Sequence, residues 1–136
     1  MTKRAQHLTG PEDLRRFLDA MPHDVQLLFD CDGVLWEGNK LYDGIIPTFQ
    51  MLRARKARMA FVTNNATSSR AGYVEKFHRL GLDWVTKEMV FTSGYAAAVW
   101  IKRKLLPTLP EGSRRVYAIG QPGLCVLHLR LGGPSG

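Results

Sequence analysis

Residues 25–33 read Val-Gln-Leu-Leu-Phe-Asp-Cys-Asp-Gly, a short apolar run that ends in a polar cluster. Runs of this kind are typical of strands that are buried on both faces of a parallel sheet. Because polar residues follow at once, the strand should deliver its carboxyl end to solvent or to a site. We therefore predict a strand over residues 25–29 and a candidate functional loop at Asp30–Gly33.

The same alternation of apolar runs and helical patterns continues along the chain. Further strands are predicted at Met59–Val62, Met89–Thr92 and Val116–Ile119. Helices are predicted to start near Pro11 and Pro47, after Ser68 or Ser69, and at Gly94, the last one running to Leu106. Strands that alternate with amphipathic helices predict an α/β fold with a doubly wound, Rossmann-like parallel sheet.

Composition is that of an ordinary globular protein, with 45% hydrophobic and 23% charged residues in a chain of 136. The longest apolar run, Tyr95–Ile101, is too short to cross a bilayer. The basic N-terminus has no apolar stretch behind it, and two cysteines do not make a disulfide framework. These features predict a cytoplasmic protein without a membrane partner.

The net charge of +7 raises the question of nucleic acid. The basic residues fall in short groups that interrupt the apolar-periodic segments. They carry no pattern of base-stacking aromatics and no zinc-ligand spacing. We interpret them as solvated helix faces and predict no nucleic-acid partner.

Polar clusters follow two of the predicted strands, Asp30–Gly33 after the first and Thr63–Asn65 after the second. In open α/β sheets, ligands bind beyond the carboxyl ends of the strands. Two carboxylates at such an end, Asp30 and Asp32, suit a hard cation such as Mg²⁺ together with a substrate phosphate. One carboxylate could attack phosphorus, and the other could protonate the leaving oxygen and later activate water.

Neutral donors for a phosphoryl group are available beside these carboxylates. The Gly33 N–H could face an anionic oxygen, and Thr63 and Asn64 offer a hydroxyl and an amide. The alternative is purely structural: the aspartates would cap a turn, and Thr63–Asn65 would be an ordinary loop. Glycine motifs that cradle nucleotides and the nucleophile elbow of serine hydrolases are absent from the sequence.

Three stretches of the sequence resemble the haloacid-dehalogenase-like hydrolases. Leu28–Trp36 resembles the first motif of that superfamily, and within it the 4-nitrophenylphosphatase and phosphoglycolate phosphatase group. Phe61–Asn65 and the helix behind it resemble the second motif. Phe91–Tyr95 is similar to the same group, especially to its fungal members. The resemblance extends from about residue 12 to about Gly123.

This resemblance implies a Mg²⁺-dependent phosphatase that acts on small phosphate monoesters, phosphoglycolate among them. Asp30 would be the nucleophile and a metal ligand. Asp32 would be the general acid and base, with its main-chain carbonyl on the metal. Thr63 and Asn64 would hold the phosphoryl group, and Asn65 would line the same pocket.

Members of the group also have a cap domain, a lysine third motif and an acidic fourth motif, which this sequence does not show. We expect residues 1–112 to be the N-terminal portion of the catalytic core. Residues 113–136 would be the start of the cap region with a divergent tail. The abrupt change after Gly123 predicts a C-terminally truncated or frame-shifted chain with weak or no activity. The alternatives are a non-catalytic module that binds phosphate or a partner, and a fragment that folds poorly.

Overall fold

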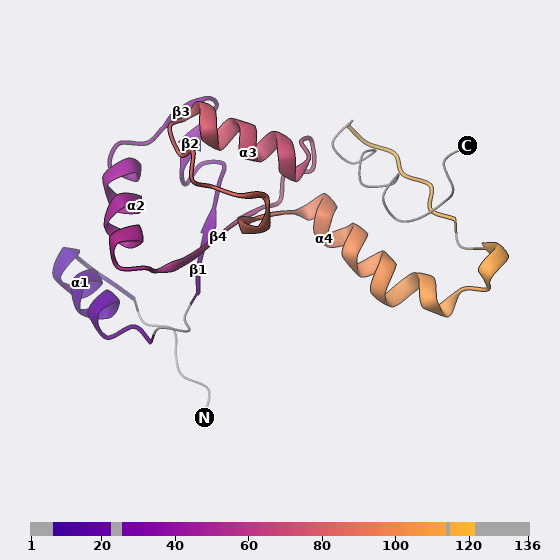
Figure 1. Ribbon diagram of the computed structural model, residues 1–136, viewed down its shortest axis with the longest axis horizontal. Helices are drawn as coiled ribbons and strands as arrows, with labels where there is room; N and C mark the ends of the chain where they lie inside the picture. Colours follow the sequence, from indigo (N-terminus) through magenta and orange to yellow (C-terminus); the bar gives the residue numbers. More distant parts are fainter. Residues whose placement is uncertain (1–6, 23–25, 114, 122–136) are drawn as a thin grey trace.

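A three-stranded parallel sheet forms the centre of the computed structural model, which describes residues 7–22, 26–113 and 115–121. The strands are β1 (Gln26–Asp30), β4 (Arg58–Thr63) and β5 (Val90–Thr92), in the order β1-β4-β5 (Figure 1). The predicted α/β fold with a parallel sheet is confirmed, and each strand lies on a predicted apolar run. Val25, where the first predicted strand begins, lies outside the described residues.

The register of the sheet aligns the carboxyl ends of its strands. Asp30 pairs with Val62, and Thr63 pairs with Thr92. Successive side chains of a strand point to opposite faces of the sheet, so Phe29 and Phe61 lie on one face and Leu28 and Val62 on the other. The polar clusters that follow β1 and β4 therefore leave the sheet at the same edge, as predicted.

Helices cover one face of this sheet. They are α2 (Ile45–Ala54) and α3 (Arg70–Arg79), and α1 (Pro11–Asp19) adds Leu18 to the same core. The fourth helix, α4 (Ser93–Trp100), leads away from the sheet (Figure 1). Short 3-10 turns lie at Lys87–Met89, Leu106–Thr108 and Glu111–Ser113. Phe49 of α2 and Phe77 of α3 pack against Phe61 with ring-centroid distances of 5.7 and 4.5 Å. On the opposite face Leu28, Val62 and Phe91 are 67%, 41% and 39% exposed. The described helices thus supply one of the two layers of a doubly wound sheet.

Two predicted boundaries differ from the structure. Helix α2 begins at Ile45, two residues before the predicted start, because a proline in the first turn of a helix needs no hydrogen-bonded N–H. The helix predicted to run to Leu106 changes to π geometry over Ile101–Leu105. Among the described residues no helix is long and apolar enough to cross a membrane.

The strand predicted at Val116–Ile119 is wrong. These residues form no strand, and the side chains of Tyr117 and Ile119 are 89% and 81% exposed. An apolar run becomes a strand only when a neighbouring strand pairs with its N–H and C=O groups. None of the described residues provides that neighbour. The divergent tail after Gly123 lies outside the described residues.

A two-stranded hairpin, which we did not predict, lies between β1 and α2. It consists of β2 (Trp36–Glu37) and β3 (Lys40–Leu41), joined by a two-residue turn in which Gly38 has φ +57°. The segment before it is buried at Cys31, Leu35 and Trp36. The hairpin thus anchors the chain that follows the first polar cluster.

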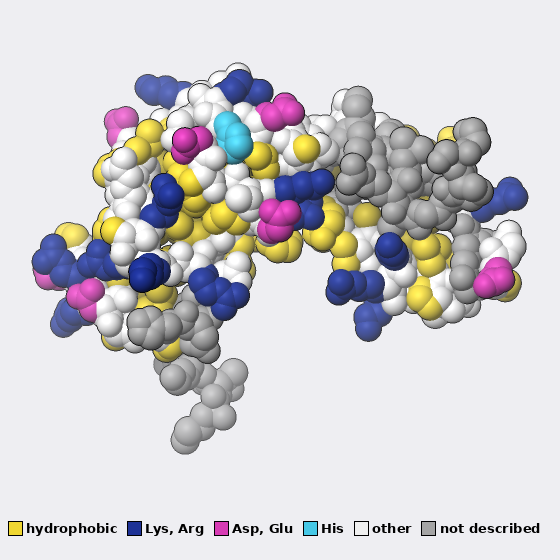
Figure 2. All heavy atoms as spheres, viewed as in Figure 1, with side chains coloured by type: hydrophobic (Ala, Val, Ile, Leu, Met, Phe, Trp, Pro, Cys, Tyr) yellow, Lys and Arg dark blue, Asp and Glu magenta, His cyan; other side chains and the backbone are white. Residues whose placement is uncertain are grey.

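Among the described residues, the basic groups at Arg15–Arg16, at 53–58 and at Lys102–Lys104 are exposed, as we interpreted them. Lys102, Arg103 and Lys104 follow α4, which leads away from the sheet in Figure 1. Figure 2 shows dark blue basic side chains next to yellow apolar ones over the part of the molecule where α4 lies in Figure 1. Trp100 at the end of α4 is 59% exposed.

Gly81 ends α3 in a conformation that other residues avoid. Its φ is +84°, its N–H donates to the His78 carbonyl at 3.0 Å, and the Leu82 N–H donates to the Phe77 carbonyl at 2.9 Å. This is a Schellman motif, in which the residue after the helix adopts the left-handed region.

We expect Gly81→Ala to lower the free energy of unfolding by about 1–2 kcal/mol, because a Cβ is strained in the left-handed region. Gly72→Ala is the matched control inside the same helix. A Cβ at Gly72 would make ordinary contacts, the nearest with Ser68 Cβ at 3.5 Å. The free energy of unfolding of that variant should rise by roughly 0.5–1 kcal/mol, because alanine is a better helix former than glycine. Urea unfolding measures the free energy of unfolding of both variants. Equal changes in the two variants would contradict the left-handed conformation assigned to Gly81.

Candidate active site

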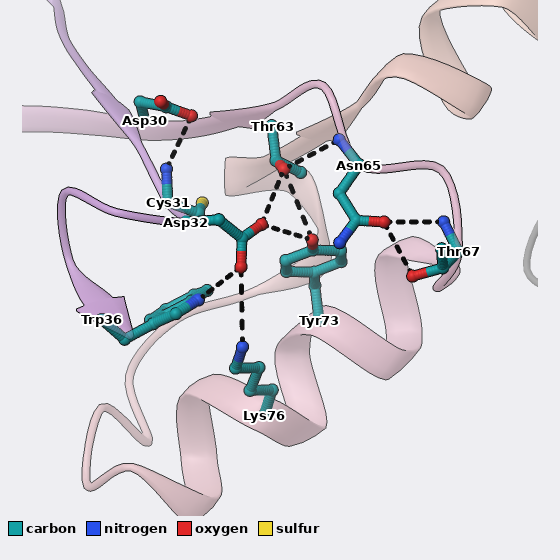
Figure 3. Close-up of polar contacts among 9 residues, drawn as sticks. All are labelled: Asp30, Cys31, Asp32, Trp36, Thr63, Asn65, Thr67, Tyr73 and Lys76. Carbon is teal, nitrogen blue, oxygen red and sulfur yellow. Dashed lines mark hydrogen bonds and ion pairs between the residues drawn. The ribbon is translucent and has the colours of Figure 1, made fainter. Parts of the chain in front are cut away.

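The Asp32 carboxylate lies at the centre of a network of side chains from three segments of the chain (Figure 3). Its Oδ1 accepts a hydrogen bond from Trp36 Nε1 at 2.8 Å and pairs with Lys76 Nζ at 3.8 Å. Its Oδ2 accepts from the Tyr73 hydroxyl at 3.1 Å and from Thr63 Oγ1 at 3.3 Å. Both carboxylate oxygens are therefore held from the protein side.

These contacts decide the charge of Asp32. Burial raises the pKa of its carboxyl, but the hydrogen bonds from Trp36 and Tyr73 and the charge of Lys76 outweigh burial, so that the pKa lies below its ordinary value. Asp32 is therefore ionised at neutral pH. Burial raises the pKa of the Tyr73 hydroxyl to about 12, so Tyr73 remains protonated and can donate.

Asp30 is placed differently from Asp32, although only one residue separates them. It ends β1 with an exposed side chain whose Oδ1 accepts the Cys31 N–H at 2.9 Å. Figure 3 shows its carboxylate apart from the network around Asp32. Cys31 between them is fully buried, and burial raises the pKa of its thiol to about 12. Of these two side chains, the Asp30 carboxylate is accessible to solvent, whereas the Cys31 thiol is buried and protonated.

Gly33 forms the turn after Asp32 with φ +80°. Its N–H, which we expected to face an anionic oxygen, donates to the Trp36 carbonyl at 2.9 Å. The predicted contact with a phosphate would require this hydrogen bond to break. In the structure the glycine serves the turn, because its left-handed backbone allows the chain to reverse toward Trp36.

The loop after β4 is held by its own side chains. Thr63 is buried, and its Oγ1 accepts the Asn65 N–H at 3.1 Å. Asn65 Oδ1 accepts from the Thr67 N–H at 2.9 Å and from the Thr67 hydroxyl at 2.7 Å. The Asn64 carbonyl accepts from Ser93 Oγ at 2.7 Å, which ties the loop to the start of α4. The Asn64 side chain is exposed. The N–H groups of the Asn65 side-chain amide remain available to donate hydrogen bonds.

The structure adds three residues that the sequence did not predict as part of the site, namely Trp36, Tyr73 and Lys76. Tyr73 is on the core-facing side of α3 and is 3% exposed. Lys76 lies three residues later and therefore one turn along the same face. A cation on an otherwise apolar helix face is the signal in the sequence that could have indicated a carboxylate partner.

The residues present fit part of a magnesium site. Among the described residues there is no group of three or more His, Cys, Asp or Glu side chains that could hold a metal ion. The exposed Asp30 carboxylate is the kind of oxygen ligand that Mg²⁺ takes, whereas the Asp32 side chain is occupied by its four partners. Mg²⁺ commonly completes its shell with water and substrate phosphate oxygens.

Comparison with known proteins identifies the family. A family model described as haloacid dehalogenase-like hydrolase matches residues 27–132. Phosphoglycolate phosphatase 1A of Arabidopsis thaliana, a chloroplastic protein, is 40% identical over 124 residues, which are 91% of this chain and 32% of that protein. The 4-nitrophenylphosphatase of Schizosaccharomyces pombe is 36% identical over 120 residues, 88% of this chain and 38% of that protein.

Solved structures agree with this result. A glycerol phosphate phosphatase from Mycobacterium tuberculosis, solved in complex with magnesium, superposes with a TM-score of 0.65 at 30% identity, over 81% of this chain and 31% of that chain. The chain thus spans about a third of the length of the relatives it matches. With the first motif, the second motif and the sheet edge that joins them all in place, the chain belongs to the haloacid dehalogenase-like hydrolases.

Proposed function

We propose that this chain carries the nucleophile and the phosphate-binding loop of a Mg²⁺-dependent phosphatase for small phosphate monoesters, such as 2-phosphoglycolate or 4-nitrophenyl phosphate. The observation that carries this proposal is the arrangement of Asp30, Asp32 and Thr63 where the strands of the sheet end, with the Asp32 carboxylate held by four partners. The names of the relatives support the same class of substrate.

The two carboxylates would act in two steps. In the first, an Asp30 oxygen attacks phosphorus, the bond from phosphorus to the ester oxygen breaks, and the leaving oxygen takes a proton from Asp32. Because Asp32 is ionised at neutral pH, it must first take up that proton from water. In the second, water attacks the phosphoryl group, Asp32 accepts the proton, and the bond from phosphorus to Asp30 breaks. The ionised Asp32 of this structure is the form that the second step needs.

Neutral donors would hold the phosphoryl oxygens. The Thr63 hydroxyl and the amides of Asn64 and Asn65 lie on the loop that β4 delivers to the same edge of the sheet. Such donors stabilise negative charge best when they are fixed before the substrate binds. The hydrogen bonds of Asn65 with Thr63 and Thr67 provide that rigidity.

Asp30 and the main-chain carbonyl of Asp32 would hold Mg²⁺. When bound, the cation offsets the charge repulsion between the Asp30 carboxylate and the phosphoryl group. The magnesium complex of the mycobacterial relative supports this choice of metal.

The test is the release of 4-nitrophenolate from 4-nitrophenyl phosphate, with and without Mg²⁺. This substrate suits the chain because its phenolate leaves without much help from a proton. We expect slow release that requires Mg²⁺ and stops when a chelator is added. Release that is unaffected by the chelator would contradict the proposal. Binding of phosphoglycolate in calorimetry without any turnover would instead support a non-catalytic phosphate-binding module.

A further inference from the structure

Three oxygen atoms beside β4 compete for two protons. Tyr73 Oη and Thr63 Oγ1 lie 3.1 and 3.3 Å from Asp32 Oδ2, and 3.3 Å from each other. Each hydroxyl has a single proton to donate, so the two hydroxyls supply two protons for three contacts. Only two of the three contacts can therefore be hydrogen bonds at one time.

Thr63 and Tyr73 have different freedom in this arrangement. The Asn65 N–H donates to Thr63 Oγ1 at 3.1 Å, which fixes the oxygen but leaves the direction of its proton open. In the proposed function that proton must turn from Asp32 toward a phosphoryl oxygen. Tyr73 can then remain the donor to Asp32 Oδ2, so that this oxygen keeps a partner throughout.

The other oxygen of Asp32 is held independently of Thr63. Trp36 Nε1 donates to Oδ1, and the Lys76 ammonium lies 3.8 Å from the same oxygen and 4.3 Å from the centroid of the Trp36 ring. Trp36 and Tyr73 are 0% and 3% exposed, so their rings cannot change orientation without opening the core. The holding groups are rigid, whereas Asp32 itself is partly exposed toward the site.

We propose that Tyr73, Lys76 and Trp36 are positioning residues, which keep the Asp32 carboxylate in place when the Thr63 hydroxyl turns to the phosphoryl group. This inference rests on the proposed function for its catalytic consequence. The hold on Asp32 itself can be measured without turnover. We therefore expect changes both in the solvent exchange of the Trp36 indole N–H and in kcat.

The spectroscopic measurement is the rate of solvent exchange of the Trp36 indole N–H, whose resonance is assigned with Trp36→Phe. Asp32→Ala gives the exchange rate of the indole N–H when its hydrogen bond to Asp32 is absent. In Tyr73→Phe, which keeps the ring, and in Lys76→Met, we expect exchange to be about fivefold faster, as for the loss of one net hydrogen bond. Lys76→Arg should restore most of the protection. Tyr117→Phe and Arg79→Met are controls, since both residues are exposed and neither is one of the four side chains that hold Asp32. Unchanged exchange in Tyr73→Phe and Lys76→Met overturns the proposal.

The kinetic measurement uses the same variants with 4-nitrophenyl phosphate. We expect kcat to fall about tenfold in Tyr73→Phe with KM unchanged, because misplacing a catalytic group affects the transition state and not ground-state binding. An unchanged kcat beside faster indole exchange would overturn the positioning role. An unsubstituted chain without turnover would count against the proposed function alone, and indole exchange would still decide whether the three residues hold Asp32.

Discussion

Asp30→Asn is expected to reduce the Mg²⁺-dependent hydrolysis of 4-nitrophenyl phosphate by at least about a hundredfold, since loss of a covalent nucleophile removes the main reaction path. An amide oxygen is a weak nucleophile and carries no charge to share with a cation. The variant should fold normally, because the Asp30 side chain is exposed and its amide oxygen can still accept the Cys31 N–H. Initial rates of 4-nitrophenolate release measure the effect.

Asp83→Asn is the matched control for this prediction. Asp83 is an exposed aspartate that follows α3, away from the carboxyl ends of the strands. The control removes the same charge and should leave the rate within a factor of about two, as is usual for surface substitutions. If Asp30→Asn and Asp83→Asn hydrolysed the substrate at the same rate, Asp30 could not be the nucleophile.

The second large effect concerns stability. Phe61→Ala is expected to lower the free energy of unfolding by about 3–5 kcal/mol, which is typical when a buried aromatic side chain is removed. Phe61 is 0% exposed, and its ring contacts those of Phe29, Phe49, Phe77 and Trp84. Because domains of this size are stabilised by only about 5–15 kcal/mol, the variant should be close to unfolding.

Urea unfolding followed by circular dichroism measures this loss. Phe17→Ala is the control, since Phe17 on α1 is 37% exposed. Phe17→Ala should lower the free energy of unfolding by less than about 1.5 kcal/mol, because part of the Phe17 side chain already contacts water. A cost for Phe61→Ala as small as that for Phe17→Ala would show that the aromatic cluster does not form the core.

The strands of the sheet could be predicted because each is a compact apolar run between polar residues. The run that contains Leu27 and Phe29 and the one that contains Phe61 have neighbours to pair with, and they became β1 and β4. Val116–Ile119 has the same composition but no pairing strand among the described residues, and local sequence does not contain that information. The hairpin of β2 and β3 escaped prediction because two-residue strands show no periodicity.

Part of the site could be predicted for a related reason. Asp30, Asp32 and Thr63 stand where strands end, and parallel pairing brings strand ends together whatever the rest of the fold does. The partners of Asp32 depend instead on how α3 packs on the sheet. Tyr73 and Lys76 come within reach of the carboxylate only through that packing, about forty residues further along the chain.

The uncovered face of the sheet has a consequence for the behaviour of the protein in solution. Leu28, Val62 and Phe91 present adjoining apolar side chains to water. Among the described residues, no strand pairs with the outer sides of β1 and β5 in the three-stranded sheet. Apolar surface next to unpaired strand edges favours self-association. The fraction of associated protein increases with protein concentration, whereas the folding equilibrium of a monomer does not depend on it. Dilution is therefore the variable that separates the stability of the fold from the attraction between its copies.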